Sequence, residues 1–87
     1  MTADIYYHNA FNKDRLIHVI DADHGTCEAL GVLFRLEGFQ TDTSQSITHF
    51  LAKLDRKLPD VIVINMQVDG EDTLPTVLRF KSMRPGS

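Results

Sequence analysis

Two acidic residues and one amide follow the two most strand-like runs of the chain. Asp21 and Asp23 come just after the apolar run Leu16–Ile20, and Asn65 comes directly after Val61–Ile64. Open α/β sheets place ligands and chemistry at the carboxyl ends of their strands. A carboxylate at such a place could bind a cation or act as a nucleophile, whereas an amide is a poor nucleophile and a neutral ligand. The sequence therefore indicates a polar site in which Asn65 occupies the place of the main chemical group.

The run before Asn65 is the element around which the other elements can be placed. Its four residues, Val61, Ile62, Val63 and Ile64, are all β-branched and favour a pleated strand. An unbroken apolar run is typical of a central parallel strand that is buried on both faces. Pro59 suits the entry to such a strand because it cannot donate to a sheet ladder.

The segments before this strand alternate between strand-like and helical patterns. Leu16–Ile20 predicts a strand, and the acids and glycine of residues 21–25 predict a loop. From Thr26 the apolar residues recur at helical spacing up to Gly38, a typical helix stop. Residues 39–43 predict a short, partly exposed strand. The first helix is expected to carry its apolar face on Cys27, Leu30, Leu33 and Phe34.

Two further helices are predicted. Ser46 can cap a helix that ends before Pro59, and Thr73 can cap another, with Pro75 in its first turn. A loop over residues 66–72 separates the second of these helices from the preceding strand. The expected apolar residues are Ile47, Phe50, Leu51 and Leu54 in one helix and Leu74, Val77, Leu78 and Phe80 in the other.

Three βα units in succession predict an α/β fold with an open parallel sheet. Right-handed crossovers favour the strand order 2-1-3, which makes the first and third strands neighbours. Asp21 and Asn65 should then face each other. The α/β domain is expected to span residues 16–87, and residues 1–15, with the short cluster Ile5-Tyr6-Tyr7, form an amino-terminal arm.

Composition and residue spacing argue against several functional classes. A net charge of −3 over 87 residues without a basic stripe argues against direct nucleic-acid binding. No run is long and apolar enough for a membrane span, and no signal peptide is apparent, so a cytoplasmic location is expected. Cys27 is expected to pack as a small hydrophobe. The dispersed His8, His18, His24 and His49 lack metal-ligand spacing.

Several short stretches together resemble the receiver domain of bacterial two-component response regulators. They are Ile17-His18-Val19-Ile20-Asp21 for the first strand and its acid, Gly38-Phe39 after the first helix, Ser46 to Leu51 at the start of the second helix, Pro59-Asp60-Val61-Ile62-Val63-Ile64 before the phosphoacceptor, and Arg84-Pro85 at the end of the third helix. The resemblance covers residues 16–87 without a gap. It implies a doubly wound, flavodoxin-like, three-layer fold.

The same resemblance implies that the family's chemistry is lost. In the family an aspartate accepts a phosphoryl group, and acidic residues hold magnesium. Asn65 stands at the phosphoacceptor position, and Ala22 stands where the family has a second metal-binding acid, so Asp21 alone remains of three carboxylates. The family's fourth and fifth strands have no counterpart in residues 16–87, which implies an incomplete fold that lacks them.

These features lead us to expect a degenerate receiver-like domain of a bacterial response or transcriptional regulator, without enzymatic activity, cofactor or metal. It would act as a phosphorylation-independent interaction and dimerisation module, with Val61, Ile62, Val63 and Ile64 as the candidate dimer edge. Its other partners would be regulator domains or proteins, and DNA would be reached only through an output domain outside this chain. Two alternatives stay open: a phosphoryl-accepting receiver with an atypical acceptor, and a small-molecule-sensing module that uses the acidic pocket.

Overall fold

The computed structural model describes residues 14–65, 67–68 and 70–83. The elements in chain order are β1 (Leu16–Ile20), α1 (His24–Leu36), β2 (Gln40–Ser44), α2 (Ile47–Leu54), β3 (Val61–Ile64), β4 (Gln67–Val68), β5 (Glu71–Asp72) and α3 (Leu74–Met83). The expected arm, including Ile5-Tyr6-Tyr7, lies outside the described residues except for its last two positions, and the Arg84-Pro85 match also lies outside them.

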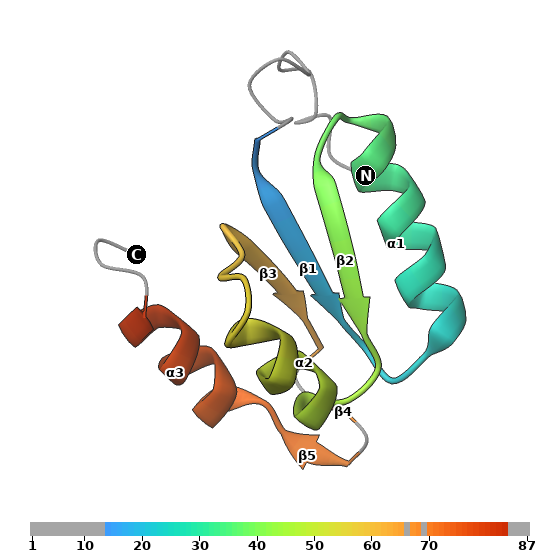
Figure 1. The fold of residues 1–87 in the computed structure, drawn as a ribbon. Coiled ribbons are helices and arrows are strands. Elements are labelled where there is room, and N and C mark those ends of the chain that lie inside the picture. Colours follow the sequence, from blue (N-terminus) through green and yellow to red (C-terminus); the bar gives the residue numbers. More distant parts are fainter. Residues whose placement is uncertain (1–13, 66, 69, 84–87) are drawn as a thin grey trace.

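The three longer strands form one parallel sheet in the order β2-β1-β3, as predicted (Figure 1). Leu16 pairs with Gln40 on one side of β1, and His18 pairs with Ile62 on the other. Helix α1 covers one face of the sheet, and α2 and α3 cover the opposite face (Figure 1). The architecture is therefore a three-layer α/β open sheet, consistent with a truncated flavodoxin-like fold.

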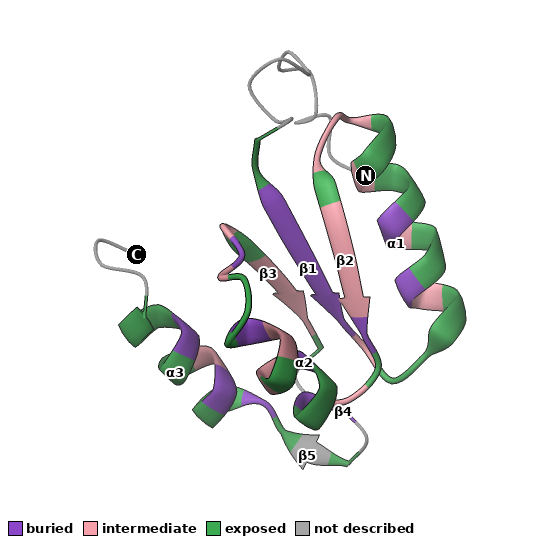
Figure 2. Cartoon of the chain, in the orientation of Figure 1, coloured by how far each residue is buried: buried purple, intermediate pink, exposed green. Residues whose placement is uncertain are grey.

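Strand β1 is the buried centre of the sheet, and all five of its residues are buried (Figure 2). Ile17 and Val19 pack with Cys27 of α1, while Ile20 packs into the cluster beneath α2 and α3. Successive residues of a strand point to opposite faces, so one strand supplies two cores.

The apolar run of β3 predicted burial on both faces, and that prediction was wrong, whereas the edge position that follows from the predicted order 2-1-3 is confirmed. Val61 is 41% exposed and the next three residues are only half-buried. The reason is position: β1 has a neighbour on each side, whereas among the described residues β3 pairs with β1 alone. Its aliphatic run therefore lies along an edge of the sheet.

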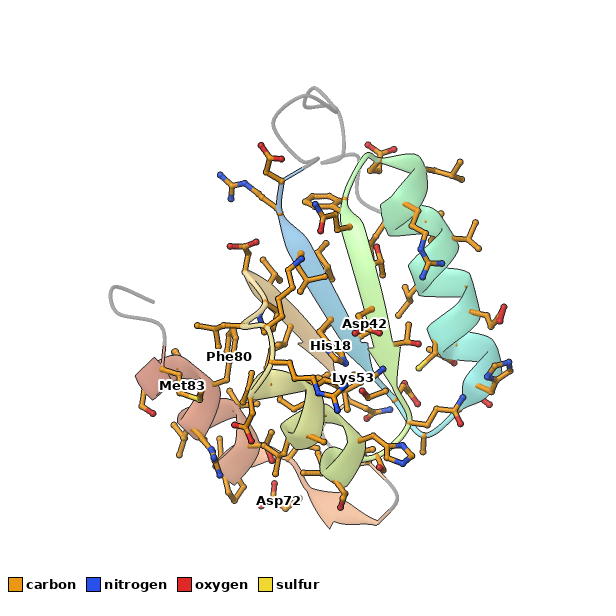
Figure 3. The ribbon with its side chains drawn as sticks, viewed as in Figure 1. His18, Asp42, Lys53, Asp72, Phe80 and Met83 are labelled. Carbon is orange, nitrogen blue, oxygen red and sulfur yellow. The ribbon has the colours of Figure 1, made fainter. Side chains whose placement is uncertain are left out.

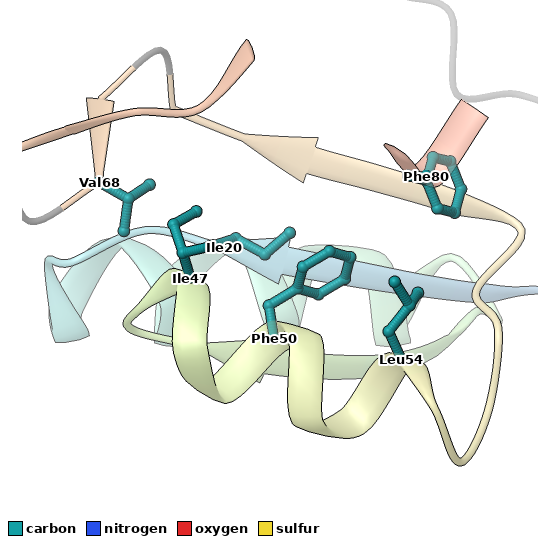
Figure 4. Close-up of a cluster of buried hydrophobic side chains, with 6 residues drawn as sticks. All are labelled: Ile20, Ile47, Phe50, Leu54, Val68 and Phe80. Atoms are coloured by element: carbon teal, nitrogen blue, oxygen red, sulfur yellow. The ribbon is translucent and has the colours of Figure 1, made fainter. Parts of the chain in front are cut away.

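The larger core lies between the sheet and the two helices on its α2 face. It consists of Ile20, Ile47, Phe50, Leu54, Val68 and Phe80 (Figure 4). The predicted apolar face of α2 is confirmed, and the Ser46 hydroxyl caps this helix by accepting from the backbone N–H of His49 at 3.1 Å.

The predicted apolar face of the third helix is right for Phe80 and wrong for two of its leucines. Leu74 and Leu78 are exposed, whereas Thr76 and Phe80 are buried one turn apart. Thr73 precedes the helix as expected, but its hydroxyl donates to a strand end, and the Asp72 carboxylate accepts from the backbone N–H of Leu74 at 3.1 Å. The apolar pattern alone was therefore a poor guide to how α3 docks.

Two smaller differences concern α1 and the segment after β3. Helix α1 begins at His24, two residues earlier than predicted, and Leu33 is exposed on it. The loop predicted over residues 66–72 contains a short antiparallel ribbon of β4 and β5. Gly70 lies between these strands with φ of +80°, a conformation that glycine adopts without steric cost.

No helix in the described part of the chain has the length and apolar character needed to cross a membrane.

Candidate functional site

The carboxyl ends of β1 and β3 meet through one side-chain hydrogen bond. The Asn65 amide Nδ2 donates to Asp21 Oδ2 at 3.3 Å, and the Asn65 backbone N–H donates to the Ile20 carbonyl, also at 3.3 Å. The expectation that Asp21 and Asn65 face each other is therefore confirmed. The pair joins a carboxylate to an amide donor. Across the strand ends, Asp21 therefore meets a hydrogen-bond donor and not a second negative charge.

The other oxygen of Asp21 is held by its own loop. Asp21 Oδ1 accepts from the backbone N–H of Asp23 at 2.9 Å, a turn in which the intervening Ala22 contributes no polar side chain. Both carboxylate oxygens thus have donors from this chain. A single carboxylate already bonded on both oxygens offers a cation little of the oxygen cage that magnesium or calcium requires.

Asp23 serves as the N-cap of α1. Its Oδ2 accepts from the backbone N–H of Thr26 at 2.8 Å and from the Thr26 hydroxyl at 2.7 Å. These hydrogen bonds, the side-chain one first, lower the pKa of Asp23 below its ordinary value. The carboxylate is therefore committed to the start of the helix, which agrees with the prediction that the acids of this loop form turns and caps.

Two buried groups fix the backbones of the strand ends. Cys27 Sγ donates to the Asp21 carbonyl at 3.3 Å, and the buried Thr73 hydroxyl donates to the Asn65 carbonyl at 2.8 Å. Burial raises the pKa of the Cys27 thiol, which disfavours the reactive thiolate. The predicted packing role of Cys27 is confirmed, whereas nothing in the sequence pattern pointed to Thr73 as the residue that ties α3 to β3.

Metal-ligating side chains do not gather elsewhere in residues 14–65, 67–68 and 70–83: no group of three His, Cys, Asp or Glu residues could hold an ion there. His24 and His49 are exposed on separate helices, and His8 and Asp69 lie outside the described residues. The strand-end site is a small hydrogen-bonded polar cluster in which Asp21 pairs with the Asn65 amide and Asp23 caps α1.

A second polar constellation lies on the α2 face of the sheet, and sequence analysis did not predict it. A hollow of about 370 Å³ is lined by Leu16, His18, Gln40, Thr41, Asp42, Lys53, Arg56 and Lys57. Lys53 Nζ donates to Asp42 Oδ1 at 3.0 Å and to the Thr43 carbonyl at 2.7 Å (Figure 3). The signal that could have revealed it is the spacing of the three cations, which places them at and beyond one end of α2.

His18 forms part of the inner wall of this hollow. Its side chain is almost fully buried, with 2% of the residue exposed, and its Nε2 lies 2.7 Å from Ser44 Oγ. The ring packs edge-to-face against Phe50 with 4.9 Å between centroids. Burial lowers the pKa of His18 to about 4, more than the nearby Asp42 raises it, so the imidazole is neutral at neutral pH.

Asp42 keeps its charge beside this neutral ring. Partial burial acts to raise the pKa of Asp42, but the hydrogen bonds from Lys53 and from the Thr43 backbone N–H outweigh it and leave the pKa below its ordinary value. Asp42 and Lys53 therefore form an ion pair at the rim of the hollow.

Comparisons with known proteins add no relative: family models, curated proteins and solved structures each gave no match to this chain. The class of the protein is accordingly defined by its own fold, an α/β open sheet with strand order 2-1-3 and polar residues at the strand ends.

Proposed function

We propose that this chain is a degenerate receiver-like domain of a bacterial response or transcriptional regulator that works by protein–protein contact without phosphorylation. Its activity would be set by dimerisation or by binding a partner protein, since anything that binds one state of a domain shifts the population towards it. The receiver assignment rests on the short sequence resemblances, and the strand order agrees with it.

The hydrogen bond between Asn65 and Asp21 is the observation that carries the non-catalytic part of the proposal. Phosphoryl transfer to a side chain needs a nucleophile and a cation to offset the developing charge. Here an amide stands at the nucleophile position, and it donates to the one carboxylate at 3.3 Å. Ala22 adds no second acid.

The edge of β3 that pairs with no other strand among the described residues supports the part of the proposal that concerns protein–protein contact. A strand edge with unpaired backbone groups is a template for pairing with another chain. Pairing of two β3 strands around a two-fold axis would be antiparallel and would extend the sheet across a symmetric dimer. Helix α3 lies on the same side of the molecule as this edge (Figure 1), and its exposed Leu74 and Leu78 would enlarge the contact beyond four residues.

We expect the chain to sediment as a dimer at micromolar concentrations and the Val61→Lys variant to sediment as a monomer. Val61 is the most exposed residue of β3, so the lysine can reach water without disturbing the core. A charge on an edge strand opposes pairing of strands. Val61→Thr keeps the β-branched shape without a charge and is the matched control, which should remain dimeric.

Two results of this sedimentation experiment would count against the edge. A monomeric native chain would remove the dimer altogether. A dimer that survives Val61→Lys but dissociates on Leu36→Ser would place the contact on α1, where Leu36 and its neighbours Val32 and Leu33 are exposed.

We expect no change in intact mass when the chain is incubated with a small phosphodonor and magnesium. Asn65 is a poor nucleophile and Asp21 is already hydrogen-bonded on both oxygens. A mass increase of one phosphoryl group would favour the alternative, a receiver with an atypical acceptor. The variants Asn65→Ala and Asp21→Asn would then identify the modified residue.

The remaining parts of the proposal concern location and partners. We place the protein in the cytoplasm, where a free thiol such as that of Cys27 is ordinary. Its partners would be a second copy and other regulator domains or proteins, and DNA would be contacted only through an output domain outside these residues. The net charge of −3 agrees with the absence of direct DNA contact in this proposal.

A further inference from the structure

The hollow on the α2 face is at the far end of the sheet from the Asp21–Asn65 pair. Leu16 and Gln40, which begin the two paired strands, line it, whereas Asp21 and Asn65 follow the ends of their strands. Lys53, at the end of α2, and Arg56 and Lys57, just after it, close the hollow from the other side. It is therefore a separate feature from the strand-end site.

Positive charge exceeds negative charge around this hollow, although the whole chain is acidic. Three cations face one carboxylate, that of Asp42. Lys53 is paired with Asp42, and Lys57 Nζ donates to the neutral Gln40 amide oxygen at 3.1 Å. Within the described ranges, neither of the ion pairs involves Arg56. Two positive charges therefore remain without a carboxylate in the hollow.

The inner wall of the hollow is uncharged and largely apolar. Leu16 and His18 are both buried, and the His18 imidazole is neutral at neutral pH. Charges that sit beside such a wall are screened by less water than charges on an open surface, so their interaction with an anion is stronger. The volume of about 370 Å³ lies within the usual range for small-molecule pockets, roughly 300–1,000 Å³.

We propose that this hollow binds a small organic anion with a doubly charged head group of the phosphate monoester class. A phosphate monoester carries nearly two negative charges at neutral pH, which matches the two uncompensated cations. Arginine and lysine are the usual side-chain donors to phosphate oxygens, with Arg56 suited to a bidentate contact. The organic part would lie against Leu16 and the neutral face of the wall.

The test is a titration of the ¹⁵N-labelled full chain with phenyl phosphate, followed by amide chemical shifts at low ionic strength. We expect saturable shifts confined to residues 40–42 and 53–57. Arg56→Gln and Lys57→Gln should each weaken binding roughly tenfold, the loss of one charge-assisted hydrogen bond. Both side chains belong to exposed residues, so both variants should fold, and their spectra report this directly.

Lys81→Gln is the matched control because it removes an exposed cation of α3 that does not line the hollow, and it should bind phenyl phosphate as the native chain does. Inorganic phosphate should bind more weakly than phenyl phosphate. Non-saturating shifts, native affinity in Arg56→Gln and Lys57→Gln, or an equal loss in Lys81→Gln would overturn the site. Equal affinity for the two phosphates would overturn the organic part of the ligand. None of these readouts depends on the β3 edge, so a failure here leaves the proposed dimer to its own test.

Discussion

Replacing Phe50 with alanine should lower the free energy of unfolding by about 3–5 kcal/mol, the usual cost of removing a buried aromatic side chain. Phe50 has no exposed surface and lies at the centre of the cluster between α2, α3 and the sheet (Figure 4). The variant also loses the edge-to-face contact with His18. Small domains have only about 5–15 kcal/mol of stability, so this loss is a large fraction of the total.

Urea unfolding followed by far-ultraviolet circular dichroism would measure this effect. The control is Leu36→Ala on α1, where 70% of the leucine is exposed and the expected change is about 0.5 kcal/mol or less. Similar losses in the two variants would show that the cluster around Phe50 is not the main core. Equal slopes of free energy against urea concentration would confirm that both variants unfold from a comparable compact state.

The stability of the chain should fall as the pH is lowered from about 7 to about 4.5, and His18 should be the cause. The pKa of His18 is lowered from 6.5 to about 4 in the folded chain by burial. The unfolded chain therefore binds the proton more readily throughout this interval, and stability decreases as the pH falls. The whole difference between the folded and unfolded pKa values of His18 corresponds to about 2–3 kcal/mol in the free energy of unfolding, after allowance for solvent near the open hollow.

Urea unfolding at several pH values would test this, with His18→Gln as the variant and His49→Gln as the control on the exposed face of α2. We expect the slope between pH 6.5 and about 4.5 to disappear in His18→Gln and to persist in His49→Gln. Asp42, whose pKa is lowered, loses its stabilising charge only below its ordinary value of 3.8 and so adds little in this interval. A native slope in His18→Gln would assign the titration to another group.

The order and type of the main elements could be predicted because their signals are local. The bounds of Val61–Ile64 and Leu16–Ile20 follow from β-branched runs, and Ser46 and Gly38 punctuate the helices. The relative burial of the two strands does not follow from their apolar runs but from the strand order 2-1-3, which gives β1 two neighbours and β3 one. An apolar run reports that a strand can be buried, but the number of neighbours that a strand has depends on pairing between distant segments.

The candidate site shows the same division. The contact between Asp21 and Asn65 follows from the strand order alone and could therefore be predicted. The basic hollow could not be predicted, because Gln40 and Asp42 come from β2 and Lys53 from α2, and they meet only when α2 packs across β2. On α3 the apolar pattern includes Leu74, Leu78 and Phe80 alike, yet only Phe80 of these three is buried, because it packs into the cluster between α2 and the sheet.

The alternation along β1 has a consequence for the whole molecule. Ile17 and Val19 face one layer, while His18 and Ile20 face the other. A slip of one position along β1 would exchange these sets: the imidazole would move among the aliphatic side chains beside Cys27, and Val19 would take its place near the lysines. The register of β1 therefore determines the character of both layers. It decides which face of the sheet is apolar and which face can carry charged side chains.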